Sequence, residues 1–178
     1  MRFLIARISI LCVLGILAAF DRVATAQPGV RDLVRLDAGN PVEKEVRALL
    51  REWRREVLVK DVKKLVGRTW PEYRESVRHH LSRPNGQLYK MLYVGPHPLT
   101  ELLRKVPEAG LVSFRHRMND EVAYVVGCFA SDTQMLANIE SFAGLMKAVD
   151  NKRLFCLNLA YDPAGATWDI DYTFGGDL

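Results

Sequence analysis

Residues 40–58, NPVEKEVRALLREWRREVL, decide more about the fold than any other stretch of the chain. Asn40 is a good N-cap, Pro41 suits the first helical position, and Glu43 follows three residues after the cap. Apolar side chains then recur with a period of 3.6 residues, while arginines and glutamates fill the other positions. The apolar stripe consists of Val42, Val46, Leu49, Leu50, Trp53 and Val57. The pattern predicts a long amphipathic helix that packs by one face.

Shorter elements are predicted after this helix. Capping residues and apolar spacing favour short helices from Asp61 to Gly67 and from Thr69 to Leu81. Leu88 to Val94 is interpreted as a strand, because Gly95-Pro96-His97-Pro98 breaks the chain directly after it. One more short helix is expected from Leu99 to Val106.

The second half of the chain is rich in β-branched and aromatic residues. Val112 to Met118 alternates apolar and polar side chains, which predicts a strand with two different faces. Val122 to Ala130 is apolar throughout and suits a central strand. Leu154 to Tyr161 and Thr167 to Phe174 are predicted to form a closing hairpin. Between them and the earlier strands, Ser131 to Asn151 favours a helix, with a mobile lid as the functional alternative.

The first residues have the order of a secretory signal peptide. Arg2 and Arg7 precede an apolar run over residues 8–20, and small residues lead up to Ala26. The run is shorter than the roughly 20 residues that a spanning helix needs. We therefore expect residues 1–26 to be removed and the protein to be exported, periplasmic or secreted, with no stable membrane insertion afterwards.

Composition indicates one globular domain. The chain has 178 residues, of which 49% are hydrophobic and 26% charged, so it can build a core of its own. Residues 27–39 are expected to form an exposed lead-in and residues 40–178 a single domain. The basic residues alternate with acids and lack interleaved aromatics, so nucleic acid is not expected as a partner.

Three features together resemble the nuclear transport factor 2-like superfamily, which includes SnoaL-like proteins and ketosteroid isomerase. They are the long opening helix, the junction from Val59 to Leu65, and the closing alternation from Thr167 to Tyr172. The resemblance spans residues 41–174. It implies an α+β fold in which a curved antiparallel sheet wraps around the N-terminal helices as a cone with an apolar cavity. It also implies a homodimer formed through the sheet.

Four side chains are candidates for lining that cavity: Tyr73, His116, Trp168 and Tyr172. His116 stands on an otherwise apolar strand face, where an imidazole can act as a donor or a base. A plain packing role remains open for all four side chains. Asp169 and Asp171 alternate away from the aromatic face, so the sequence does not support the carboxylate chemistry of ketosteroid isomerase.

Cysteine and histidine usage predicts no metal and no cofactor. Cys12 belongs to the leader, and Cys128 and Cys156 either form a disulfide or remain two buried thiols, which the sequence leaves open. His79 and His80 are adjacent and would diverge on a helix, so they do not make a metal pair. We find no phosphate-binding, dinucleotide or nucleophile-elbow motif.

These observations favour binding over catalysis. The first hypothesis is an exported domain that binds a small apolar or amphipathic ligand, or a protein partner. The second is an isomerase- or dehydratase-like enzyme with His116 as general base. The third is an interaction module that presents the basic helix face of Arg47, Arg51, Arg54 and Arg55 to an acidic surface.

Overall fold

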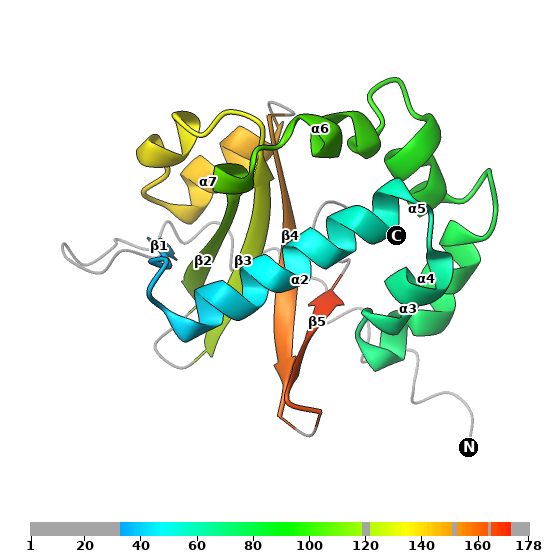
Figure 1. Ribbon diagram of the computed structural model, residues 1–178, viewed down its shortest axis with the longest axis horizontal. Helices are drawn as coiled ribbons and strands as arrows, with labels where there is room; N and C mark the ends of the chain where they lie inside the picture. Colours follow the sequence, from blue (N-terminus) through cyan, green and yellow to red (C-terminus); the bar gives the residue numbers. More distant parts are fainter. Residues whose placement is uncertain (1–32, 119–121, 151–152, 164, 172–178) are drawn as a thin grey trace, which may run out of the picture. The chain divides into compact units, whose positions relative to one another are not determined.

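The structure, a computed structural model, describes residues 33–118, 122–150, 153–163 and 165–171. It combines a five-stranded antiparallel sheet with helices, so the fold is α+β (Figure 1). The strands are β1 (Leu33–Arg35), β2 (Leu111–Met118), β3 (Val122–Ala130), β4 (Leu154–Asp162) and β5 (Thr167–Asp171). The α-helices are α2 (Pro41–Leu58), α3 (Val62–Gly67), α4 (Arg74–Leu81), α5 (Gln87–Tyr89), α6 (Leu99–Lys105) and α7 (Phe142–Asp150). Single 3-10 turns are η1 (Pro71–Tyr73), η3 (Glu108–Gly110) and η4 (Met135–Asn138), and η2 (Lys90–Val94) is a π-turn.

Helix α2 is confirmed as the sequence predicts it. The Asn40 side chain accepts a hydrogen bond from the Val42 N–H at 2.9 Å, and Pro41 lies in the first turn. The predicted stripe is buried except for Val42, which is partly buried, and two acids are buried with it, Glu43 and Glu56. Both acids are ion-paired, with Arg47 and Arg68 respectively, which offsets the cost of burying their charge.

The interpretation of Leu88 to Val94 as a strand is wrong, because this segment is helical, formed by α5 and η2. Leu88 and Leu92 are four residues apart and both almost fully buried, which is the spacing of one helix face. Tyr89 and Tyr93, at the same spacing, have ring centroids 5.0 Å apart. The i, i+4 contacts therefore favour a helix over a strand in this segment, and the Gly-Pro loop ends that helix.

The sheet is a meander in the order β1-β2-β3-β4-β5, and every neighbouring pair is antiparallel. It is open, because β1 and β5 do not pair with each other. Next to β5, Ile170 donates to the Arg68 carbonyl at 2.8 Å and accepts from the Trp70 N–H at 3.1 Å. The junction before η1 therefore covers one edge of the sheet.

The two faces of the sheet carry separate apolar clusters. Helix α2 crosses one face (Figure 1), where it packs with the other N-terminal helices against side chains of the strands. The strand residues in this cluster include Phe129, Leu157, Leu159 and Ile170. On the opposite face, α7 and η4 contribute to a second cluster with Phe114, Val126 and the two strand cysteines. Alternation along each strand thus feeds both clusters.

Two sequence expectations need correction. Part of the segment expected to be an exposed lead-in is strand β1, and Leu33 and Leu36 are buried. Three residues are too short a run for periodicity to signal a strand. The single helix expected over residues 131–151 is shortened to η4 and α7, because residues 139–141 interrupt it. The signal peptide, the turn at residues 119–120 and the end of the last strand lie outside the described residues.

Cys128 of β3 and Cys156 of β4 form a disulfide in the structure. They are directly opposite each other in the β3–β4 register, with Cα atoms 4.1 Å apart. Both side chains are buried beneath α7, in the second apolar cluster. Of the two states that the sequence leaves open, the structure has the bridged one.

Candidate ligand-binding cleft

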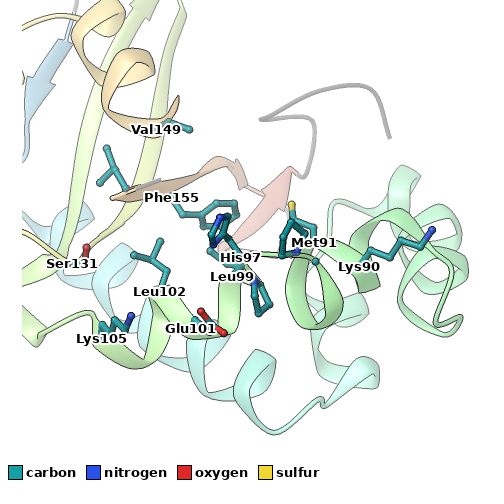
Figure 2. Close-up of a pocket in the computed structure, with 14 residues that line it drawn as sticks. Lys90, Met91, His97, Leu99, Glu101, Leu102, Lys105, Ser131, Val149 and Phe155 are labelled. Atoms are coloured by element: carbon teal, nitrogen blue, oxygen red, sulfur yellow. The ribbon is translucent and has the colours of Figure 1, made fainter. Parts of the chain in front are cut away.

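A cleft of about 750 Å³ opens between α6, the loop before it and the ends of β3 and β4. Its lining is largely apolar, and Figure 2 shows the side chains that converge on it from four parts of the chain. This volume lies within the range of roughly 300–1,000 Å³ that is typical of small-molecule sites. The lining residues are Lys90, Met91, residues 95–98, Leu99, Glu101, Leu102, Lys105, Ser131, Val149, Leu154 and Phe155.

One wall of the cleft is α6 with the loop that precedes it. Pro96 and Pro98 fix two φ angles of this loop, and the Gly95 N–H donates to the Lys90 carbonyl at 2.8 Å. The loop therefore holds a defined course between η2 and α6. Leu99 and Leu102 then point their side chains into the cleft from the first turns of the helix (Figure 2).

The floor of the cleft is continuous with the core of the protein. Phe155 lines the cleft and also stacks on Trp53 of α2, with ring centroids 5.9 Å apart and an interplanar angle of 14°. Trp53 is fully buried and also contacts Phe129, with ring centroids 5.3 Å apart, and the Phe129 ring lies 6.2 Å from that of Phe155. This aromatic stack gives the floor a rigid surface, because its rings are fixed from below.

The end of the floor is fixed by hydrogen bonds between Ser131, directly after β3, and Arg153, directly before β4. The backbone N–H and the hydroxyl of Ser131 both donate to the Arg153 carbonyl, each at 3.2 Å. The Ser131 hydroxyl is therefore already used as a donor. Val149 of α7 also belongs to the apolar lining.

Charged side chains occur only at the rim of the cleft, among the described residues. Lys90, Glu101 and Lys105 are all exposed. None of the three is in an ion pair within the described part of the chain. An apolar centre with charges at the edge suits an amphipathic molecule.

The three predicted pocket residues that the structure describes do not line this cleft. His116 lies on the α7 face of the sheet and stacks on Phe142, with ring centroids 4.0 Å apart. Tyr73 is on η1 and 41% exposed. Trp168 lies on the α2 face, where its indole N–H donates to Glu45 at 2.9 Å. Tyr172 is outside the described residues.

His116 and Trp168 therefore lie on opposite faces of the sheet and cannot contact the same small ligand. His116 is also 8% exposed, with its ring covered by Phe142. A general base must come within hydrogen-bond reach of its substrate. The His116 ring stacks on Phe142 and does not line the cleft.

The buried carboxyl group of Asp169 lies on the other face of β5 from Trp168, as the sequence alternation predicts. Burial raises the pKa of Asp169, the positive charge of Arg74 lowers it, and the charge of Asp162 adds to the increase. The pKa of Asp169 is therefore raised above the ordinary value of an aspartate. Asp169 does not line the cleft.

The basic face of α2 is partly neutralised. Arg47 pairs with Glu43 of the same helix, and Arg51 pairs with Glu108 of η3. Arg51, Arg54 and Arg55 border a smaller hollow of about 340 Å³ together with the apolar residues Leu58 and Val59. Of the four arginines proposed as one interaction surface, Arg47 and Arg51 are thus in ion pairs, whereas Arg54 and Arg55 are in no ion pair with a described residue.

Within the described residues, no group of three or more His, Cys, Asp or Glu side chains is arranged to hold a metal ion. No helix among them has the length and apolarity needed to cross a bilayer.

Sequence reasoning missed the cleft although it identified several of its parts. The Gly-Pro-His-Pro loop and the helix after it were both expected, but nothing local signals that they face Phe155 and Ser131. Lys105 and Phe155 are 50 positions apart, and their proximity depends on how the helices pack on the sheet. A short helix that begins after two closely spaced prolines was the available signal.

Comparisons with protein-family models, with curated proteins and with solved structures found no match to this chain.

Proposed function

We propose that this protein binds a small amphipathic molecule in the cleft between α6 and the β3–β4 end of the sheet. The observation that carries this proposal is the cleft itself, with about 750 Å³ of space over a largely apolar lining. Its rim supplies a few charged groups, which is the usual composition of a small-molecule site.

The construction of the cleft supports a binding role. The prolines of the loop, the serine bridge to Arg153 and the Trp53–Phe155 stack all fix its walls before any ligand arrives. A site that is ordered in advance loses less conformational entropy on binding. The described lining residues offer no nucleophile paired with a base, so binding is favoured over catalysis.

The proposal is tested with Nile red, a neutral dye whose fluorescence increases in apolar surroundings. The test variant is Leu102→Glu, which places a charge in the middle of the cleft. The matched control is Val59→Glu, because Val59 is an exposed apolar residue outside the cleft, 67% accessible. Met91→Glu, at the exposed edge of the cleft, replaces the test variant if Leu102→Glu does not fold.

We expect the wild-type protein and Val59→Glu to bind the dye equally, and Leu102→Glu to bind it at least about tenfold more weakly, since a buried unpaired charge costs more than 1.4 kcal/mol. Circular dichroism and a urea titration establish that each variant is folded. Equal binding by all three proteins, or no binding by the wild type, contradicts the proposal.

The relationship to the nuclear transport factor 2-like superfamily is part of the same proposal. It is supported by the antiparallel meander and by the long opening helix on one face of the sheet. The finer expectation, a sheet curved around the helices as a cone, remains a proposal. Solution of an experimental structure of the mature chain tests it directly.

We also propose that the protein is exported. The buried Cys128–Cys156 disulfide supports export, because such bridges persist in oxidising compartments. Detection of the chain, shortened at about residue 27, outside the cytoplasm tests the prediction. Retention of the intact chain inside the cell contradicts it.

A further inference from the structure

We infer that the amphipathic ligand carries one anionic group, such as a carboxylate, which binds Lys105 at the Ser131 end of the cleft. This inference rests on the proposed binding function and specifies its ligand class. It is based on the distribution of charge around an otherwise apolar site.

The balance of charge at the rim is positive. Two lysines and one glutamate are the charged side chains among the described lining residues. Lys90 and Lys105 form no ion pair with a described residue, so their ammonium groups are available to a ligand. A cationic ligand would find a single carboxylate, Glu101, which is four residues before Lys105 on the same helix.

The two lysines are not equivalent. In Figure 2, Lys105 and Ser131 lie at one end of the cleft, next to Leu102, whereas Lys90 extends away from the other end. A molecule with its tail along Leu102, Leu99 and Phe155 therefore has its polar end near Lys105. Lys90 lies beyond the opposite end of that path.

The Ser131 hydroxyl does not replace the lysine. It donates its hydrogen to the Arg153 carbonyl, so it offers an anion no donor. The Ser131 backbone N–H is used by the same carbonyl. Among the described lining side chains, Lys105 is thus the cation at this end of the cleft that can bind a negative charge. This makes the inference testable by single substitutions.

The expected effects are moderate, because Lys105 is exposed. An exposed ion pair contributes an energy that corresponds to about a two- to fivefold change in affinity. Glu101 repels an anion held by Lys105. Removal of its charge should therefore strengthen binding by a similar or smaller factor. Salt should weaken the wild-type interaction and leave a Lys105 variant nearly unchanged.

The experiment measures displacement of Nile red from the full chain by three probes with the same tail: decanoate, decan-1-ol and decyltrimethylammonium. Each probe is titrated into the wild type, Lys105→Ala and Glu101→Gln. Arg104→Ala is the matched control, because Arg104 is an exposed cation of the same helix that does not line the cleft. Every titration is repeated at low and moderate ionic strength.

The inference predicts that decanoate binds the wild type more tightly than decan-1-ol does, and that Lys105→Ala removes this preference. Glu101→Gln should increase it, and Arg104→Ala should leave it unchanged. Equal affinity for the acid and the alcohol, or a preference for the cationic probe, overturns the inference while the cleft remains a binding site. If no probe displaces the dye and the dye itself does not bind, the proposed function fails as well.

Discussion

Reduction of the Cys128–Cys156 disulfide should cost the protein a large part of its stability. The bridge closes a loop with a sequence separation of 28 residues. Under the chain-entropy relation, such a loop reduces the entropy of the unfolded chain enough to stabilise the fold by about 3.6 kcal/mol at 25 °C. Small domains have a total free energy of unfolding of roughly 5–15 kcal/mol, so this contribution is a substantial share.

Comparison of the oxidised and reduced wild type isolates the cross-link. Both forms contain the same side chains, and two buried thiols still pack as small apolar groups. The sulfurs are inaccessible in the folded protein, so the reductant is added in denaturant and the chain is then refolded. With urea slopes of about 1–3 kcal/mol per molar, the unfolding midpoint should fall by between about 1 and 3.5 M.

The double variant Cys128→Ala/Cys156→Ala provides a second measurement, and its midpoint should be close to that of the reduced wild type. Counting free thiols in the denatured protein before reduction tests the premise. Two free thiols per chain, or an oxidised midpoint equal to the reduced one, would refute the reasoning. If the reduced chain does not refold, this supports stabilisation by the disulfide only when the oxidised chain refolds under the same conditions.

Two further changes have defined outcomes. Gly110→Ala should destabilise the fold by about 1–3 kcal/mol or more, because its added Cβ would lie 2.1 Å from the backbone oxygen of Ala130. The measurement is a urea titration. Gly39→Ala is the control, because a Cβ added at Gly39 would have no atom within 4 Å. Asp169→Asn should abolish the pH dependence of folding stability that the Asp169 carboxyl group causes. Burial raises the pKa of Asp169 despite Arg74, so the folded state holds its proton more tightly than the unfolded state does. Stability of the wild type should therefore fall as the pH rises from about 4, relative to the variant, and parallel pH profiles of the two proteins would contradict this.

Helix α2 could be predicted from the sequence because its determinants are local. The Asn40 cap, Pro41 and the stripe that includes Trp53 act within one continuous segment. The long strands β2, β3 and β4 were predictable for the same reason, since alternation or a continuous apolar run is visible within each of them. Their antiparallel order follows from the pairing of consecutive segments.

The segment from Leu88 to Val94 shows where local patterns mislead. A run of seven residues that is apolar except for Lys90, before a Gly-Pro break, is compatible with a strand or a helix. The choice depends on burial, because Leu88 and Leu92 must face the same core. Strand β1 could not be predicted because it is too short to show a local pattern. Its three residues gain their conformation from pairing with β2, where Leu33 lies opposite His116.

The pairing of the two cysteines depended on a long-range register. Both were expected in strands, but one residue of slip between β3 and β4 would turn one sulfur to the α2 face. In the observed register Cys128 is opposite Cys156, and Phe129 is opposite Phe155. The same register therefore places the disulfide beneath α7 and the aromatic pair beneath α2.

Because of this register, the Phe155 side chain belongs both to the core and to the lining of the cleft. The ring stacks on Trp53, which has no exposed surface, and its other side lines the cleft. Truncation of Phe155 would remove core packing as well as ligand contact, so a loss of binding in that variant would have two explanations. Leu102 and Lys105 lie on the α6 wall, nearer the solvent, and changes there act on the cleft with less effect on the stack. Side chains of α6, and not the aromatic floor, are therefore the positions at which binding can be distinguished from folding.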